Sequence, residues 1–323
     1  MRILLLRPEV PGVRTGNRLT ALRWGALWRQ LGHVVRSRAQ DDGEPADVVV
    51  ALHAEKCARP LLQALARLPR AVSVLALGGT DLLGPEAGPR PAWSPQAEQA
   101  LARADAIVLR HRLQGDGLPA NAAPRVRVIG PSAAPIGPRP PASELCCEVL
   151  SLAHLRSIKE PFVLADAMAM LPPATPWVAV HLGAALDDAA RLAAEQTMAG
   201  NPRWRWLGEW PRTAARQRLR TARAFVLASR SEGSPGAVVE AIVQQVPVLA
   251  SDIAAHRGLL GADWPGLFPV GDAQALADRL QRLVADAAWE RDLAARAAAL
   301  APAFAPARER ADWARLFAEL GAG

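Results

Sequence analysis

Residues 231–240 read Ser-Glu-Gly-Ser-Pro-Gly-Ala-Val-Val-Glu, which sets Glu232 and Glu240 eight positions apart across a Gly/Pro turn. The apolar run Ala224–Ala228 before the turn predicts a buried parallel strand, and Ala241–Val243 after it continues a predicted helix. The turn therefore lies at the carboxyl end of a strand. A helix that starts there favours an anion such as a diphosphate, because backbone N–H groups point out of its first turn.

The two glutamates have different places in this segment. Glu240 lies about one turn into the helix, where its two oxygens suit a ribose diol, and Glu232 in the loop faces whatever lies beyond the phosphates. An isolated pair of this kind is usually a pair of solvated acids favoured by the helix dipole, but the flanking strand and helix indicate a nucleotide-sugar site. The donor-binding groups expected beside Glu240 are Ser234 and the backbone N–H groups of Gly236, Ala237 and Val238.

Composition excludes several classes of protein. The chain has 323 residues, which suits two domains, and half of them are hydrophobic without any apolar run long enough to span a bilayer. We therefore expect a cytoplasmic protein without stable membrane association. The net charge of +7 comes from arginines scattered through predicted helices, which argues against nucleic acid as a partner. The three cysteines lack metal-ligand spacing and are expected to be buried thiols.

Short apolar strands alternate with amphipathic helices, which predicts an α/β fold with two doubly wound, Rossmann-like domains facing a central cleft. The Pro-rich stretch Pro131–Pro141 suits a flexible connection between them. We expect an acceptor-side domain at 1–135, a nucleotide-sugar-binding domain at 145–303, and a helix at 304–323 that crosses back to the first domain. The first helix is expected to pack through Leu19, Leu22, Leu27 and Leu31. The expected strands are 2–6, 47–52, 72–77, 106–109 and 126–129, then 148–152, 177–181, 205–207, 224–228 and 248–250.

A second loop carries cations to the same predicted edge. The segment Ser151–Pro161 leaves a strand and enters a helix, and Arg156 and Lys159 within it are spaced so that both can reach one diphosphate. Exposed cations without a function are an equally good reading of this loop alone. The neighbouring Glu232/Glu240 segment favours the functional one.

The pattern of Arg156 and Lys159 followed by Glu232 and Glu240 resembles the donor site of retaining GT-B glycosyltransferases of the family-4 type. This resemblance covers the C-terminal half of the chain. It implies that Arg156 and Lys159 neutralise the leaving diphosphate, that Glu240 holds the ribose, and that Glu232 lies near the transferred sugar. Arg156, Lys159 and Glu232 are therefore the expected catalytic residues.

The N-terminal half resembles selenosugar synthases of selenoneine biosynthesis through Thr15–Trp24, Val50–Ala54 and Ala76–Leu82, as does the later segment 256–272. The resemblance implies transfer of glucose or N-acetylglucosamine from a UDP-sugar to selenophosphate. A carbon–selenium bond forms, UDP leaves, and loss of phosphate then gives a 1-selenosugar.

An anionic acceptor such as selenophosphate needs positive groups and hydrogen-bond donors rather than a strong base. The first predicted helix starts at Gly16, whose backbone is expected on the donor side, and the expected acceptor-binding residues are Asn17, Arg18, His53, Thr80 and Asp81. Asp81 has two possible roles, to bind a sugar hydroxyl or to orient His53. A helix cap at Thr80–Asp81, a core histidine and a surface arginine remain equally good alternatives.

No cofactor and no metal are expected, because the acid pairs Asp41–Asp42 and Asp187–Asp188 suit turns or helix starts better than a nucleotide loop. Two other functions remain open. An ordinary hexosyltransferase that uses a hydroxyl acceptor would keep the same C-terminal site. A non-catalytic nucleotide-sugar sensor is also compatible with the fold.

Overall fold

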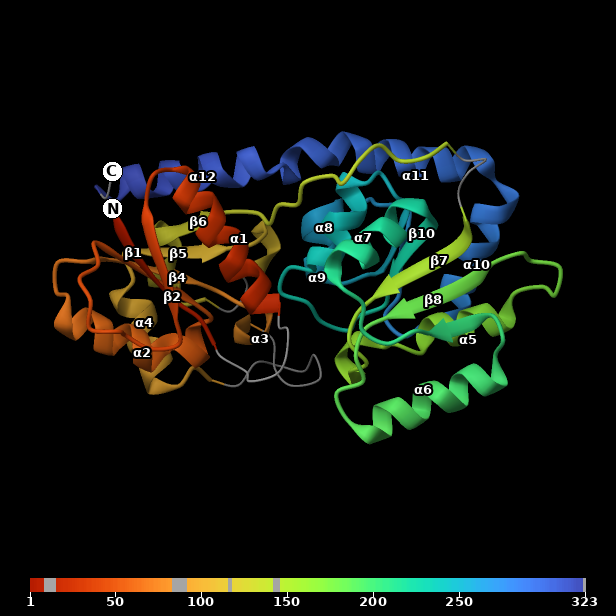
Figure 1. Ribbon diagram of the computed structural model, residues 1–323, viewed down its shortest axis with the longest axis horizontal. Coiled ribbons are helices and arrows are strands. Elements are labelled where there is room, and N and C mark those ends of the chain that lie inside the picture. The colour runs from red at the N-terminus through yellow and green to blue at the C-terminus, as the bar shows by residue number, and fades with distance from the viewer. Residues whose placement is uncertain (9–15, 83–91, 116–117, 142–145, 322–323) are drawn as a thin grey trace. The chain divides into compact units, whose positions relative to one another are not determined.

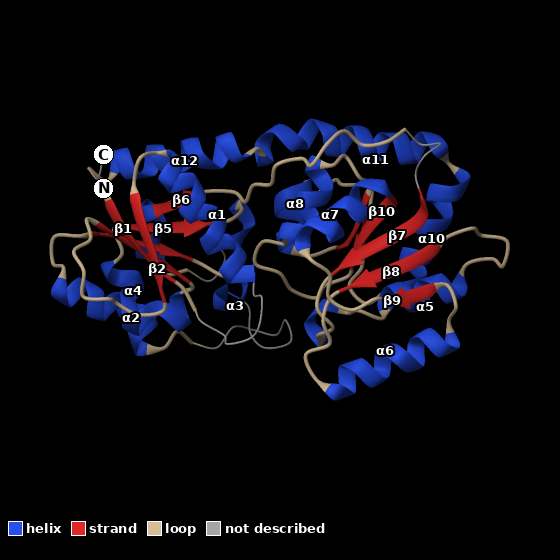
Figure 2. Ribbon diagram, in the orientation of Figure 1, coloured by secondary structure: helices blue, strands red, loops and turns tan. Residues whose placement is uncertain are grey.

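The computed structural model describes residues 1–8, 16–82, 92–115, 118–141 and 146–321 (Figure 1). The chain divides into two units, Met1–Pro131 with Pro306–Gly323, and Ser132–Ala305. Each unit contains a six-stranded sheet in which all paired strands are parallel, flanked by helices (Figure 2). The predicted alternation of strands and helices is confirmed in both units.

In the first unit the chain order of the sheet reverses around its first strand. The sheet has the order β2-β1-β3-β4-β5-β6. The chain runs from β1 to β2 on one side and then crosses to β3 on the other side of β1, so the switch point lies between β1 and β3. Open α/β sheets bind ligands at the carboxyl ends of strands at such a switch point. The strands are β1 Arg2–Leu6, β2 Val34–Arg38, β3 Val48–Leu52, β4 Val72–Ala76, β5 Ala106–Leu109 and β6 Val126–Val128, and the helices are α1 Gly16–Gln30, α2 Ala54–Arg67, α3 Gly79–Leu82, α4 Pro95–Arg103 and α12 Pro306–Glu319.

The second unit has the strand order β12-β11-β10-β7-β8-β9, with its switch point between β7 and β10. Short 3₁₀ turns include η5 Ser157–Lys159, which follows β7. The strands are β7 Cys146–Leu152, β8 Val178–Leu182, β9 Trp204–Trp206, β10 Ala222–Leu227, β11 Val248–Ser251 and β12 Leu267–Phe268, and the helices are α5 Val163–Met170, α6 Asp188–Gly200, α7 Arg212–Thr221, α8 Gly236–Val243, α9 Ala254–Leu260, α10 Ala273–Ala285 and α11 Ala287–Leu300.

Three expectations about local structure were wrong. The edge strands β2 and β12 were not predicted, because β2 is partly polar and β12 has only two residues. Leu19 and Leu22 do not form the packed face of α1, since they are 40% and 63% exposed. Cys147 is exposed rather than buried.

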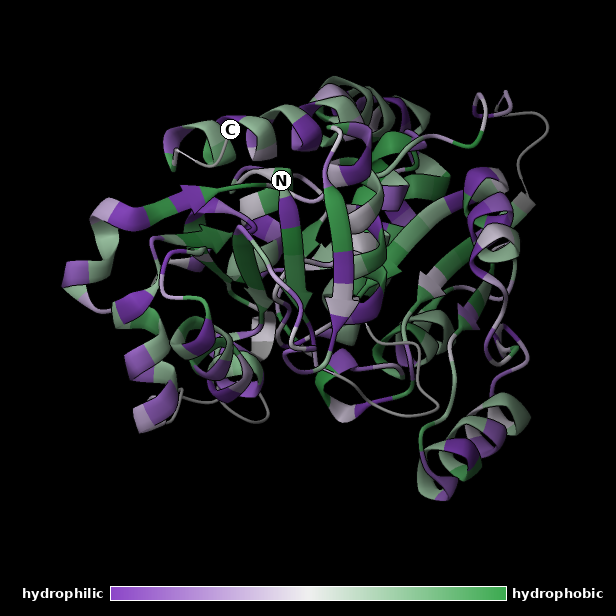
Figure 3. Ribbon diagram, turned by 60° about the vertical axis from the view of Figure 1, so that its left-hand side comes forward, coloured by the Kyte–Doolittle hydropathy of each residue, from purple (hydrophilic) through white to green (hydrophobic). Residues whose placement is uncertain are grey.

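Helix α1 packs instead through its tryptophans. Trp24 and Trp28 are fully buried, and the ring centroid of each lies 4.8 Å from that of Trp313 on α12. The buried carboxylate of Glu309, also on α12, accepts from Trp24 Nε1 at 2.7 Å and from Arg23 Nε at 2.9 Å. The C-terminal helix is therefore part of the core of the first unit, beside α1 (Figure 1). The sheet strands, mostly hydrophobic in Figure 3, supply most of the remaining core.

In the second unit, strand β8 anchors the loop that follows β7. His181 near the end of β8 is buried, and its Nε2 lies 2.8 Å from the carbonyl oxygen of Ala153. The carbonyl only accepts, so Nε2 carries the proton. Gly183 permits the close approach, because a Cβ there would lie 1.8 Å from the same oxygen. Only a glycine at this place leaves the loop towards Lys159 in its observed position.

We expect the stability of the protein to report on His181. Burial lowers the pKa of His181 to about 4, from an ordinary 6.5, and its Nδ1 has no partner among the described residues. The unfolded chain therefore binds more protons between these values, and the folded state loses roughly 3 kcal/mol as pH falls from 6.5 to 4. In His181→Gln, the amide can keep the bond to Ala153 without titrating. Urea unfolding at pH 7, 5.5 and 4 should show that the free energy of unfolding of this variant rises relative to that of the wild type as the pH falls.

The control is His33→Gln. The pKa of His33 is also lowered by burial, but this ring is only half-buried, so its variant should gain less. A stability difference between wild type and His181→Gln that stays constant over the pH range would contradict the prediction.

Candidate functional site

The loops at the switch point of the second unit bring together two residues predicted from separate segments. Lys159 ends the turn after β7, and Glu232 lies in the loop after β10. Lys159 Nζ is 2.5 Å from Glu232 Oε1, and the two side chains are 22% and 10% exposed. β7 and β10 are adjacent parallel strands, so their carboxyl ends meet at one edge of the sheet. The ion pair follows from that adjacency.

Further contacts fix the two loops to each other. The backbone N–H of Arg230 donates to the carbonyl of Ile158 at 2.9 Å, and the Arg230 side chain pairs with Glu160. Ser229 Oγ donates to Glu232 Oε1 at 2.8 Å. The carboxylate of Glu232 thus has a neutral donor from its own loop and a cation from the other loop.

The electrostatics of Glu232 depend on this arrangement. Burial alone raises the pKa of this carboxyl, but the charge and hydrogen bond of Lys159, with smaller effects from His256 and Ser229, leave the pKa lowered overall. Glu232 is therefore an ionised group in a largely dry site. Its charge is stable there because Lys159 is next to it.

The start of α8 offers donors beside this pair. α8 begins at Gly236, as the sequence predicts, and a Cβ on Gly236 would meet no atom within 4 Å. The Oγ of Ser234 is buried without a hydrogen-bond partner among the described residues, and no described group accepts from the Gly236 or Ala237 amides. The Val238 amide is different, since it already donates to Pro235 at 3.1 Å. This amide is occupied within the first turn of α8, and its role at a diphosphate stays a prediction.

Glu240 is held by cations from α7. Arg212 donates to its Oε1 through Nη2 at 2.5 Å and through Nε at 2.9 Å, and Arg216 Nε lies 3.7 Å from the same oxygen. The Glu240 side chain is 12% exposed. These contacts involve one oxygen and fix the direction of the other.

Arg156 lies just before η5, and its side chain is exposed. The carbonyl of Arg156 accepts from the Lys159 amide at 2.8 Å, so the two residues share one tight turn. The guanidinium makes no hydrogen bond or ion pair with Lys159 or with any other side chain that the structure describes. Its role at a diphosphate stays a prediction.

In the first unit, His53 and Asp81 form a buried pair at the switch point. His53 directly follows β3, and its Nδ1 lies 2.6 Å from Asp81 Oδ1. The same carboxylate accepts from the amides of Ala54 at 2.9 Å, Glu55 at 3.0 Å and Gly78 at 2.7 Å. Four protein donors surround Asp81, so the geometry favours its role in orienting His53 over direct binding of a sugar hydroxyl.

The backbone of His53 is strained, which is common at functional positions. Its φ of 98° is in the region that favours glycine. Because a carboxylate only accepts, the proton of His53 is on Nδ1, 2.6 Å from Asp81. The Lys56 amide lies 3.3 Å from the same nitrogen, but a protonated Nδ1 has no lone pair with which to accept a hydrogen bond from it. In the neutral tautomer with its proton on Nδ1, Nε2 is the nitrogen that carries the lone pair.

The remaining predicted site residues of the first unit lie at two places. Gly16, Asn17 and Arg18 form the first turn of α1, where Gly16 and Arg18 are exposed and Asn17 is half-buried. Thr80 lies in α3 next to Asp81, and its side chain, like residues 9–15, is outside the described part of the structure. Their roles stay predictions.

Several residues of the site were not found from the sequence. Ser229 lies three positions before Glu232, so its role was within reach of a local reading. Arg212 and Arg216 reach Glu240 from another helix, and His256 acts on Glu232 from α9. Those three contacts depend on the packing of elements that are distant in the sequence.

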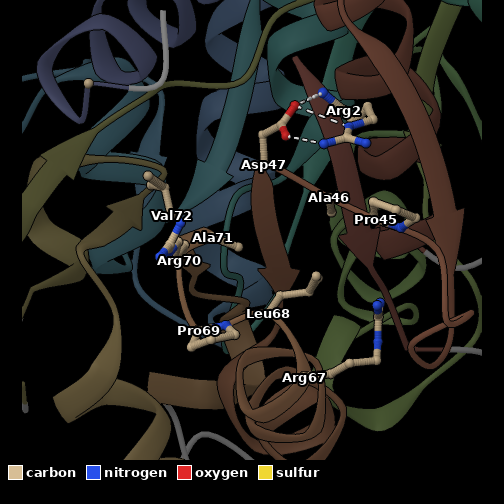
Figure 4. Close-up of a pocket in the computed structure, with 11 residues that line it drawn as sticks. Arg2, Pro45, Ala46, Asp47, Arg67, Leu68, Pro69, Arg70, Ala71 and Val72 are labelled. Atoms are coloured by element: carbon tan, nitrogen blue, oxygen red, sulfur yellow. Dashed lines mark hydrogen bonds and ion pairs between the residues drawn. The ribbon is translucent and has the colours of Figure 1, made fainter.

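A hollow of about 490 Å³ in the first unit is lined by residues at the amino ends of strands (Figure 4). Two of its three cations, Arg2 and Arg67, are paired with Asp47 and Asp41, and the hollow contains none of the predicted site residues. Over the described residues, no group of three or more His, Cys, Asp or Glu side chains is placed to hold a metal ion. None of the described helices is both long and apolar enough to cross a membrane.

Comparison with known proteins finds a family that most of the second unit resembles. Residues 147–286 match the family described as glycosyl transferases group 1. The chain is also 36% identical over 87 residues to TuaC of Bacillus subtilis strain 168, a protein provisionally named a teichuronic acid biosynthesis glycosyltransferase. That match spans 27% of this chain and only 22% of the relative.

Solved structures match the fold of nearly the whole chain. Anabaena Alr3699/HepE in complex with UDP and glucose has a TM-score of 0.77 at 17% identity, over 99% of this chain and 100% of that one. A sucrose-phosphate synthase from Thermosynechococcus elongatus has a TM-score of 0.78 at 18% identity, over 99% of each chain. At these identities the likeness shows the fold, and the predicted GT-B class of two Rossmann-like domains is confirmed.

Asp81→Asn tests the His53–Asp81 pair. An amide nitrogen at this place donates to His53 Nδ1 instead of accepting from it, so the ring takes the other tautomer. Unfilled amide contacts should lower the free energy of unfolding by ~1–3 kcal/mol. If His53 contacts the acceptor, kcat/KM for the acceptor should fall by ~10-fold or more in addition.

The matched control is Asp105→Asn. Asp105 accepts from the Ser73 amide at 2.8 Å and from Ser73 Oγ at 2.7 Å, at the opposite ends of the strands. It should lose stability with unchanged kcat/KM. Equal kinetic losses in both variants would remove His53 and Asp81 from the acceptor site.

Proposed function

We propose that this chain is a UDP-sugar-dependent glycosyltransferase that transfers glucose or N-acetylglucosamine to selenophosphate. The observation that carries the transferase assignment is the buried Lys159–Glu232 pair at the β7/β10 switch point, beside the start of α8. The group 1 match of this unit supports it. The acceptor assignment rests on the resemblance of the N-terminal segments to selenosugar synthases.

On the donor side, the second unit supplies positive charge to the leaving group. As the bond from the anomeric carbon to the diphosphate oxygen breaks, negative charge grows on UDP and the sugar becomes oxocarbenium-like. Lys159, Arg156 and the amides of Gly236 and Ala237 stabilise the first charge, and the Glu232 carboxylate stabilises the second. Glu240, fixed through one oxygen by Arg212, presents the other oxygen to the ribose.

On the acceptor side, the proposed nucleophile is the selenium of selenophosphate. Its electron pair forms the bond to the anomeric carbon while the electrons of the carbon–oxygen bond leave with UDP. Water then cleaves the phosphorus–selenium bond, which releases phosphate and the 1-selenosugar. Selenophosphate is already anionic, so the first unit needs cations and hydrogen-bond donors, the proposed roles of Arg18, Asn17 and Thr80.

A hydroxyl acceptor is the second candidate. The names of TuaC and of the sucrose-phosphate synthase indicate glycosyltransferases outside selenium chemistry, and HepE was solved with UDP and glucose. In this reading His53, with its proton fixed on Nδ1 by Asp81, has the tautomer of a proton acceptor at Nε2. A sensor that binds UDP-sugars without turnover is the third candidate.

The deciding experiment incubates the purified protein with UDP-glucose or UDP-N-acetylglucosamine and selenophosphate, followed by mass spectrometry of UDP and selenium-containing sugars. We expect a selenosugar and stoichiometric UDP. UDP release only with hydroxyl acceptors would assign the second candidate. UDP-sugar binding without turnover by any acceptor would assign the sensor, and absence of binding would reject all three.

We expect Lys159→Ala to lower kcat by about two orders of magnitude, because the charge that develops on the leaving diphosphate loses a preorganised donor. Steady-state rates of UDP release measure this. Lys56→Ala is the control, since Lys56 is the only other lysine in the sequence and is exposed on α2. An unchanged rate in Lys159→Ala would remove Lys159 from the mechanism.

Lys159→Ala also leaves the Glu232 charge buried without its partner, which can destabilise the fold by itself. The double variant Lys159→Ala/Glu232→Gln removes both charges. Its free energy of unfolding, compared with that of the single variant, separates a loss of folding from a loss of catalysis.

A further inference from the structure

His256 is a buried titratable group beside the donor site that the proposed mechanism does not use. It lies on α9 and is 0% exposed. Its Nδ1 is 2.7 Å from the backbone carbonyl of Ser251, which only accepts, so Nδ1 carries a proton. Its Nε2 is buried and has no hydrogen-bond partner in the part of the chain that the structure describes. In the neutral ring, this nitrogen holds an unused lone pair.

A chain of hydrogen bonds links this ring to the Lys159–Glu232 pair. Ser251 Oγ is 3.3 Å from His256 Nδ1 and donates to the carbonyl of Ser229 at 2.5 Å. Ser229 Oγ donates to Glu232 Oε1, the oxygen that Lys159 contacts. The ends of β10 and β11 and the start of α9 thus form one polar network around the carboxylate.

Three charged groups act on the His256 ring: Glu232, Lys159 and Asp252. Asp252 is already paired with Arg257. Burial lowers the pKa of His256, Glu232 acts in the opposite direction, and Lys159 adds to the lowering. The ring is therefore neutral at pH 7 while Lys159 stays on Glu232.

Donor binding changes that balance. In the proposed function, the Lys159 ammonium turns to the diphosphate, which leaves the buried Glu232 carboxylate without the cation now 2.5 Å from it. An unpaired buried carboxylate is costly. The diphosphate adds further negative charge near the ring. Both changes favour a proton on the one ring nitrogen that can still take it.

We propose that His256 takes up a proton at Nε2 when a nucleoside diphosphate draws Lys159 away from Glu232, so that the imidazolium replaces the ammonium as the counter-ion of the buried carboxylate. The proton comes from solvent, and His256 is a positioning residue that keeps Glu232 ionised beside the sugar. This inference rests on the proposed function of the donor site.

Calorimetric titration with UDP at pH 7.5, in buffers of different ionisation enthalpy, tests the proposal. The slope of the observed enthalpy against the buffer ionisation enthalpy gives the protons taken up per UDP bound. At this pH the terminal phosphate, with its pKa near 6, is already ionised and contributes little. The wild type should take up as much as about one proton.

His256→Asn is the main variant, because the asparagine amide can still donate to Ser251 while no group titrates. Its proton uptake should fall to near zero while UDP still binds. His181→Gln is the matched control, a second buried histidine of the same unit with one unpartnered ring nitrogen. It should keep the uptake of the wild type.

The outcomes separate the two levels of the proposal. If UDP does not bind the wild type, the proposed function fails. If UDP binds and the wild type takes up no proton, or if His256→Asn takes up as many protons as the wild type, His256 is not the acceptor and the inference is rejected. In the latter case Glu232 is the group that takes the proton, and Glu232→Gln should abolish the uptake.

Discussion

The contact between Lys159 and Glu232 is the constraint on which the proposed donor site depends. Moving either charge out of water costs several kcal/mol, and only a close partner with additional hydrogen bonds offsets that cost. At 2.5 Å, with Ser229 as a further donor, Glu232 has both. The pair in turn requires β7 and β10 to be neighbours and the loop from Ala153 to Lys159 to keep its path, which His181 and Gly183 secure. Contacts of His181 and Gly183, several residues away from the ion pair, therefore help to keep the Glu232 carboxylate charged.

Each unit has its buried polar pair at its own switch point. In the first unit His53 follows β3, and in the second unit Lys159 follows β7. The two pairs differ in chemistry. Asp81 is surrounded by protein donors and fixes a tautomer, whereas Glu232 is held by an ammonium that, in the proposed function, turns to the diphosphate. The His53–Asp81 pair is suited to keep a fixed geometry, and the Lys159–Glu232 pair is suited to rearrange when a ligand binds. In the proposed function, the first property serves to position the acceptor and the second to activate the donor.

The sequence predicted the central strands, because a strand buried on both faces is a continuous apolar run that periodicity detects. It also predicted the start of α8 at Gly236, where a Gly/Pro turn marks the boundary. Edge strand β2 was not predicted because one side of it is solvated. The face of α1 was predicted only in part, because Leu27 is buried as expected but Trp24 and Trp28, rather than Leu19 and Leu22, meet α12 from the far end of the chain. The influence of His256 on Glu232 was not predicted either, since only the packing of the fold brings α9 to Glu232.

In the proposed function, the first unit rather than the donor site decides the acceptor, since every candidate acceptor requires the same leaving group. A hydroxyl nucleophile must lose a proton, which calls for a base such as an imidazole whose other nitrogen is fixed by a carboxylate. Selenophosphate has no proton to lose at its attacking atom and is repelled by uncompensated carboxylates instead. In the first unit Asp81 is shielded by three backbone amides and the His53 ring, so its charge is largely confined to that network. An anion can therefore approach His53 without meeting a bare carboxylate, and this shielding makes the anionic acceptor compatible with a site that contains a buried aspartate.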